Sequence, residues 1–453
     1  MTVASPGDGG SARRSVGRGR VIRAAAPFAA VAAFAAATVS ASGSASPRAQ
    51  DPLERPDSLF AAGAFREAEL AYRALTLGRS PPARALARIG QLALMENRLD
   101  ESREWLVAAA SADPSDGDVL AALAEIHYRR DDFETAARLL AGTERGAFAR
   151  KLESFEGRAP NRIEADGPAQ TVLELIVTDP LPVVQLRVNG GEPANFIVDT
   201  GAGELILDPE FARSAGAELF GAESGEFAGG TTGDLRHGRI DRVELGHYVV
   251  NDVPILLLDT DRFSRATRNL PVHGILGTVL LYHFVATLDY PAERLVLRRR
   301  DAAARDELQR LASRPGTIAV PFRLAGDHFI VAQGTANDEV TRLFLVDTGL
   351  AGQAFTAPLS TIREAGIELP PDAQRGTGGA GAIDVRPIHI DELTLGEARR
   401  TRVPGIYGAF PDGLEWGHGF RIAGIVSHIF FRPWSVTFDF DGMRLLLVEP
   451  ESR

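Results

Sequence analysis

The chain has 453 residues, 45% of them hydrophobic and 24% charged, a composition typical of soluble globular proteins whose length divides into about three folded units. A formal net charge of −11 argues against nucleic-acid partners, because phosphate contacts need clustered cations. With a single lysine, Lys151, and no cysteine, Schiff-base, P-loop and thiol chemistry are excluded, as are disulfides.

Residues 1–50 have the pattern of an export signal followed by a polar tail. Arginines that include Arg13 and Arg14 precede an apolar, alanine-rich run over residues 24–39, and small residues follow it. The run is shorter than the ~20 residues that span a bilayer, which favours a cleaved signal over an anchor. We therefore expect an exported, periplasmic or secreted protein, which an uncleaved run would anchor at its N-terminus. The alternative is an Ala/Arg-rich extension without a targeting role.

Residues 51–150 are predicted to form helical hairpins. Apolar residues recur at spacings near 3.6, and similar units begin at Phe65, Leu99 and Phe133, separated by 34 (99 − 65) and 34 (133 − 99) residues. This period resembles that of tetratricopeptide repeats. The resemblance implies a concave surface for a protein partner, and the alternative is a packing module with no partner.

Beyond residue 155 the helical spacing stops and short β-branched runs begin. Residues 171–177 and 183–188 are predicted strands, followed by a turn at Asn189-Gly190. Apolar runs then alternate with Gly, Pro, Asp and Asn clusters to the end of the chain, as in all-β barrels and sandwiches. We expect one β unit over residues 165–300, a linking helix over 301–314 and a second β unit over 315–453.

The two β units contain the same succession of motifs. Asp199-Thr200-Gly201 and Asp347-Thr348-Gly349 each follow an apolar strand and lie 148 residues apart (347 − 199). Residues 274–277 (Gly-Ile-Leu-Gly) correspond to 424–427 (Gly-Ile-Val-Ser), and 287–290 to 437–440, so the register persists. A single Asp-Thr-Gly would be weak evidence, because an Asp in a β-turn often only accepts local backbone hydrogen bonds. The duplication makes the signal specific.

From about residue 170 to the end, the chain resembles the aspartic proteases, as a retropepsin-like lobe duplicated in one chain. The expected fold is multidomain α+β: all-α tetratricopeptide-like hairpins, then an all-β bilobal protease fold. The resemblance implies that Asp199 and Asp347, one from each lobe, are the catalytic residues. It also implies supporting roles for Thr200, Gly201, Thr348 and Gly349.

A carboxylate pair of this kind has a defined chemistry. Two carboxyl groups about 3 Å apart cannot both ionise cheaply, so they hold one proton between them. The ionised member can take a proton from a water that attacks a peptide carbonyl, while the protonated member donates to the carbonyl oxygen. This mechanism predicts an aspartic endopeptidase and requires no covalent intermediate, cofactor or metal.

Each lobe is also expected to carry a glycine-rich hairpin that closes over the substrate. The candidates are Gly229 and Gly230 in the first lobe and Gly378 and Gly379 in the second. Ordinary surface turns are the alternative, because glycine-rich turns are common in β proteins.

Two residues depart from the family pattern. Leu350 stands where pepsin-type lobes place a hydroxyl, and Ser427 stands where Gly277 stands in the first lobe. These departures favour an alternative function, a catalytically weak or inactive peptide-binding or scaffold protein that acts through its cleft or its helical repeats.

The expected partner is a peptide or protein substrate, with a further protein partner on the helical repeats. No H-E-x-x-H or Gly-x-Ser-x-Gly motif is present, which argues against zinc-protease and serine-hydrolase chemistry. Because both Asp-Thr-Gly segments lie in one chain, the site can form in a monomer.

Overall fold

The computed structural model of the chain describes residues 51–78, 80–143, 145–227, 231–378 and 381–450. The predicted export signal, residues 1–50, lies outside them. Within these ranges, every helix is too short or too polar to span a bilayer.

The N-terminal part is a succession of helices in which each helix contacts the next. Apolar spacing near 3.6 gives α2 one buried face, which carries Phe65, Ala68 and Tyr72. The carboxylates of Asp116 and Asp132 accept hydrogen bonds from backbone N–H groups at the starts of α5 and α6, which fixes where these helices begin. The helices are α1 (Glu54–Ala61), α2 (Phe65–Leu75), α3 (Ala83–Met95), α4 (Leu99–Ala112), α5 (Gly117–Tyr128), α6 (Phe133–Leu140) and α7 (Gly146–Glu153).

The first strand set, β3 to β11, contains a closed barrel. Its last two strands, β10 and β11, belong to a separate sheet. In the barrel the order is β8-β5-β9-β4-β3-β7, and pairing of β7 with β8 closes it. Short β1 (Arg162–Ile163) pairs antiparallel with β8, and β6 pairs antiparallel with β7. The set comprises β3 (Val183–Val188), β4 (Ala194–Val198), β5 (Leu205–Leu207), α8 (Pro209–Ser214), β6 (Glu218–Phe227), β7 (Thr231–Leu245), β8 (Tyr248–Leu257), β9 (Gly274–Leu276), α9 (Thr278–Tyr282), β10 (Phe284–Asp289) and β11 (Arg294–Arg299).

A second strand set, β13 to β21, repeats most of these pairings. β14 pairs in parallel with β19, as β4 does with β9, and β15 pairs with β18 and β19, as β5 does with β8 and β9. Helix α10 (Ala302–Ala312) precedes it. The set comprises β13 (Phe329–Gly334), β14 (Arg342–Asp347), β15 (Phe355–Thr356), α11 (Leu359–Glu364), β16 (Gln374–Gly378), β17 (Gly381–Leu395), β18 (Ala398–Tyr407), β19 (Gly424–Ser427), α12 (His428–Phe431), β20 (Ser435–Asp439) and β21 (Arg444–Val448).

The two sets meet in one antiparallel sheet of order β12-β21-β20-β10-β11-β2, which adds β2 (Gln170–Glu174) and β12 (Ile318–Ala325). The central pairing joins β10 to β20, from Ala286↔Phe438 to Asp289↔Ser435. Within it, the buried hydroxyls of Thr287 and Thr437 lie 2.8 Å apart in a hydrogen bond.

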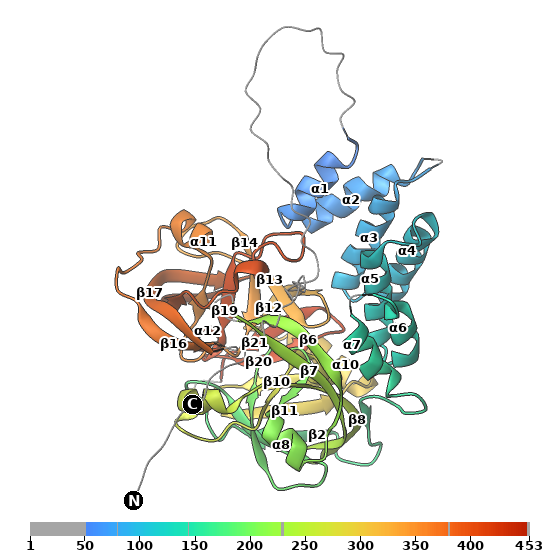
Figure 1. Cartoon of the computed structure of the whole chain (residues 1–453). Coiled ribbons are helices and arrows are strands. Elements are labelled where there is room, and N and C mark those ends of the chain that lie inside the picture. Colours follow the sequence, from blue (N-terminus) through green and yellow to red (C-terminus); the bar gives the residue numbers. More distant parts are fainter. Residues whose placement is uncertain (1–50, 79, 144, 228–230, 379–380, 451–453) are drawn as a thin grey trace, which may run out of the picture.

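The helices run along one side of the strand-rich part (Figure 1) and share a core with the second strand set. Phe60 and Phe65, from the first two helices, pack edge-to-face on Phe420, with ring centroids 5.7 and 5.0 Å away. All three rings are buried, so the helical region and the β region fold as one packed body.

Replacing Phe420 by Ala should lower the free energy of unfolding by about 3–5 kcal/mol, because it opens a cavity where the helices meet the strands. Urea unfolding followed by circular dichroism measures this. The exposed Trp416, in the same loop, is the control, and Trp416→Ala should stay within about 0.5 kcal/mol of wild type. A loss below about 1 kcal/mol for Phe420→Ala would contradict the shared core.

Candidate active site

Each Asp-Thr-Gly segment follows a strand buried between two neighbours. All five residues of β4 are buried, with β3 antiparallel on one side and β9 parallel on the other. The second strand, β14, lies in the same way between β13 and β19. Such strands need continuous apolar sequence, which both motifs supply. Asp199 directly follows β4, and Asp347 is the last residue of β14.

The threonines of the two segments bind each other reciprocally. The Thr200 N–H donates to Thr348 Oγ1 (3.1 Å), and the Thr348 N–H donates to Thr200 Oγ1 (3.2 Å). Each hydroxyl in turn donates to a backbone carbonyl of the strand that precedes the other segment. The Thr200 hydroxyl donates to the Val346 carbonyl (3.0 Å), and the Thr348 hydroxyl donates to the Val198 carbonyl (2.7 Å). Both threonines are buried, so these four bonds are shielded from water and fix the segments face to face.

Glycine is required at Gly201 and Gly349 by close approach. A Cβ on Gly201 would overlap the Asp347 carboxyl, and one on Gly349 would overlap the Asp199 carboxyl. The same glycines donate their N–H groups to the aspartate of their own segment, at 2.8 and 2.7 Å. Each carboxyl group therefore lies against the backbone of the opposite segment.

The two carboxyl groups are half-buried and share a hydrogen bond. Burial raises the pKa of Asp199 well above its ordinary range, and the charge of Asp347 and the hydrogen bond with it raise this pKa further. Burial also raises the pKa of Asp347, against the hydrogen bond from Asp199, the Gly349 N–H and the charge of His328. Because either group can carry the shared proton, we assign the shift to the pair, which holds one proton well above the range of an isolated carboxyl.

Leu350 and Ser427 bind each other in the second segment. The Leu350 N–H donates to Ser427 Oγ at 3.2 Å. In the first segment a Cβ on Gly277 would overlap the backbone of Gly203, so a serine there is excluded. The Leu350 side chain packs with Ile383, Val385 and Ala409 at the base of the β16–β17 hairpin. Ser427 is thus accommodated locally, and Leu350 adds apolar surface beside the aspartates.

His328 lies near the pair, at a position that no sequence motif marks. It occupies the turn between β12 and β13, with Nδ1 3.3 Å from the position of a Cβ on Gly203 and 2.5 Å from Asp327 Oδ1. Burial raises the pKa of Asp327, but the charge of His328, the hydrogen bond with it and the charges of Arg145 and Arg129 together hold this pKa well below its usual range. His328 has no spacing relation to either Asp-Thr-Gly, so only the fold reveals it.

The predicted flap glycines are only partly described. Gly378 ends β16, where it pairs with Gly381 of β17. Gly229, Gly230 and Gly379 lie outside the described residues. The strands that lead to them, β6 and β7 in the first set and β16 and β17 in the second, pair as antiparallel hairpins.

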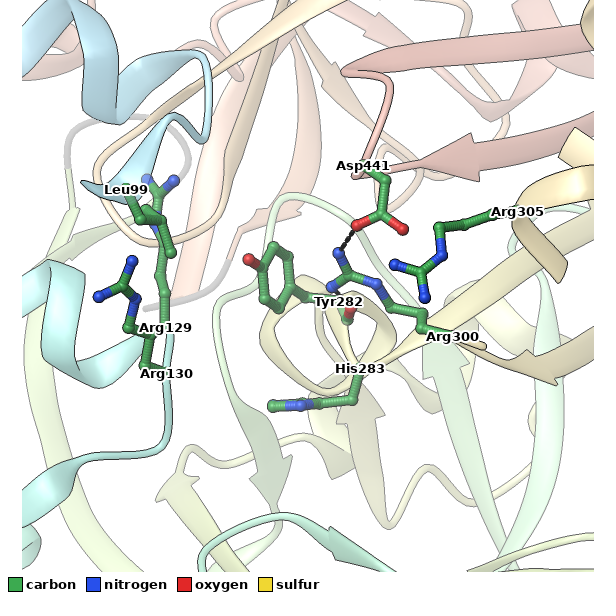
Figure 2. A pocket seen from close by; sticks show the side chains of 8 residues that line it. All are labelled: Leu99, Arg129, Arg130, Tyr282, His283, Arg300, Arg305 and Asp441. Carbon is green, nitrogen blue, oxygen red and sulfur yellow. Dashed lines mark hydrogen bonds and ion pairs between the residues drawn. The ribbon is translucent and has the colours of Figure 1, made fainter. Parts of the chain in front are cut away.

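A separate pocket of about 410 Å³ lies between the N-terminal helices and the segments that precede β10 and follow β11 (Figure 2). Four arginines line it, but three are already paired with carboxylates: Arg129 with Glu125, Arg130 with Asp100, and Arg300 with Asp441. We assign it no anion-binding role, because these pairs offset most of its positive charge. The lining residues are Leu99, Arg129, Arg130, Tyr282, His283, Arg300, Arg305 and Asp441.

Comparison with known proteins agrees with the geometry of the first segment. Residues 184–280 match a family model described as aspartyl protease. The matched part runs from β3 into α9, includes Asp199 and Gly277, and ends before Asp347. Among curated proteins, none matches the chain. The chain thus contains a region similar to aspartyl proteases, which indicates a hydrolase.

Thr348→Val should lower the free energy of unfolding by about 2 kcal/mol or more, because it leaves the buried Thr200 N–H and Val198 carbonyl without their partner. Thr348→Ser keeps the hydroxyl and should recover most of this loss. The control is Thr356→Val: the Thr356 hydroxyl is buried with no hydrogen-bond partner among the described residues, so its removal should be neutral or stabilising. Equal losses for both valine variants in urea titrations would contradict the reciprocal bonds.

Proposed function

We propose that the chain is an aspartic endopeptidase in which Asp199 and Asp347 activate one water. The observation that carries the proposal is the hydrogen-bonded carboxyl pair, held by four bonds between Thr200, Thr348 and the opposite strands. A surface that only binds peptides gains nothing from forcing two acidic groups together at a cost in electrostatic repulsion.

The proposed reaction begins with one carboxyl of the pair ionised and the other protonated. The ionised carboxylate takes a proton from the water as its oxygen attacks the peptide carbonyl carbon, and the protonated carboxyl donates to the carbonyl oxygen. The carboxyl that took the water proton then donates it to the amide nitrogen, a hydroxyl of the diol gives its proton to the other carboxylate, and the C–N bond breaks. A carboxylic acid and an amine leave, and the pair is restored with one proton.

The corresponding strand pairings in the two sets support a bilobal site with a duplicated lobe. In this reading residues 165–300 and 315–453 are the lobes, and the hairpins β6–β7 and β16–β17 are the flaps. The apolar cluster of Leu350 with Ile383, Val385 and Ala409 supports a preference for apolar substrate side chains on the second-lobe side.

The second candidate is a catalytically weak or inactive peptide-binding or scaffold protein. Leu350 favours it, since it stands where pepsin-type lobes place a hydroxyl. The Ser427 hydroxyl accepts a hydrogen bond from the Leu350 backbone N–H. The two candidates differ in whether peptide bonds are cleaved.

The remaining expectations complete the proposal. The helices are tetratricopeptide-like and offer a surface to a protein partner, the chain is exported, and the site works in a monomer. Light scattering beside activity measurements tests the last point, since activity confined to dimers would overturn it.

Asp199→Asn and Asp347→Asn should each reduce kcat/KM for peptide hydrolysis by about 10²–10⁴-fold, because each removes one proton donor or acceptor. Mass spectrometry of a mixed peptide library, with purified wild type and variants, measures cleavage. Asp391→Asn, at an exposed aspartate on β17, is the matched control and should cleave as wild type does.

Cleavage that survives either active-site change would exclude the proposed mechanism. Peptides bound equally by wild type and both variants, and cleaved by none, would favour the second candidate.

Folding stability should depend on pH through the carboxyl pair. The folded pKa of Asp199 lies above its unfolded value, so its contribution is fully present below the unfolded pKa and is lost as pH rises through the folded pKa. Relative to wild type, Asp199→Asn should therefore gain stability between about pH 4 and pH 7. Urea midpoints at both pH values test this, and a wild-type-minus-variant difference that is constant with pH would contradict the raised pKa.

A further inference from the structure

The only lysine of the chain is buried against the loop that follows Asp199. Lys151 Nζ donates to both carboxylate oxygens of Glu204, each at 2.6 Å, and the Tyr128 hydroxyl donates to Glu204 Oε1 at 2.6 Å. Lys151 is fully buried and Glu204 is 3% exposed. Lys151 lies on α7 and Tyr128 ends α5, so two helices of the N-terminal region bind one carboxylate of the β region.

Glu204 lies in the loop that follows the candidate catalytic aspartate, and this loop is hydrogen-bonded to α9. Between Asp199 and Glu204, the carbonyls of Ala202 and Gly203 accept hydrogen bonds from the N–H groups of Thr278 and Val279, both at 2.9 Å. The Thr278 hydroxyl also donates to the Thr200 carbonyl at 2.9 Å. A shift of Glu204 would therefore be passed to the loop that carries Asp199.

The same helix binds the first hairpin. The Phe148 N–H, on α7, donates to Glu223 of β6 at 3.0 Å, and the Lys151 ammonium lies 4.5 Å from the centre of the Phe148 ring. One helix thus contacts both the Asp199 loop and the stem of the β6–β7 hairpin.

We propose that Lys151, assisted by Tyr128, is a positioning residue that fixes the Asp199 loop through Glu204, so that the helical region is an integral part of the catalytic unit. This inference rests on the proposed function. It assigns the helices a role in the site that is separate from any partner they bind.

The energetics of buried ion pairs favour orientation over stability as the role of this pair. Burial lowers the pKa of Lys151, and the charge of Glu204 opposes this shift. Removing both charges from water costs more than a buried pair commonly returns, so apolar residues of similar volume often stabilise a fold equally well. Three directed hydrogen bonds, in contrast, fix the carboxylate in one place, which apolar packing cannot do.

The test compares wild type, Lys151→Met and a double variant, Lys151→Met/Glu204→Met, made together with Tyr128→Phe so that the buried Tyr128 hydroxyl is not left without its acceptor. The single variant leaves Glu204 buried and unpaired and should be destabilised. The double variant should recover a melting temperature within about 3 °C of wild type, yet keep kcat about 10–100-fold below it with KM little changed, because small misplacements of a catalytic group are costly. Arg444→Met is the matched control: it removes the partner of buried Asp439 on β20 and should leave kcat unchanged.

Hydrogen–deuterium exchange provides a readout that does not need cleavage. In the double variant, amides of residues 199–204 should exchange about tenfold faster than in wild type, while those of residues 350–352 are unchanged. A double variant with wild-type kcat and exchange would show a merely structural pair and overturn the inference. If wild type cleaves no peptide but local exchange still rises, the proposed function fails and the positioning role stands.

Discussion

Four hydrogen bonds between Thr200, Thr348 and the opposite strands are the constraint on which the site depends. They place two carboxyl groups close together, where burial raises the pKa of both and the charge of Asp347 further raises that of Asp199. The raised pKa values of the two carboxyl groups thus depend on backbone geometry, because each threonine binds the main chain of the opposite segment.

The helical region packs against both strand sets that carry the two Asp-Thr-Gly segments. Its aromatic contacts with Phe420 join it to the second strand set, and Lys151 and Tyr128 join it to the first. The helices therefore contact both halves of the β region, and the carboxyl pair lies where the two halves meet. A protein that bound the helices would therefore bind a region that already contacts the candidate active site.

The sequence predicted the parts of the site that follow from local pattern. Asp199 and Asp347 were identified because each follows an apolar strand and because their surroundings repeat, and the structure brings their segments together. His328 and Glu204 were missed, since both act through packing between elements distant in sequence. As the only lysine in the sequence, Lys151 argues against Schiff-base and P-loop chemistry. Its helical sequence context does not indicate a buried carboxylate partner. Gly229, Gly230 and Gly379 lie outside the described residues, so their place in the flaps stays a prediction.

The pairing of β10 with β20 has a consequence for how the chain could be divided. It is the point at which the sheet passes from one strand set to the other. A cut within α10 would leave two fragments, each with a newly uncovered edge strand and an unmatched threonine hydroxyl. The best pairing partner for the exposed β10 edge of one fragment is the β20 edge of the other, so the two fragments would be suited to reassembly by complementation. Each fragment alone would be prone to aggregate.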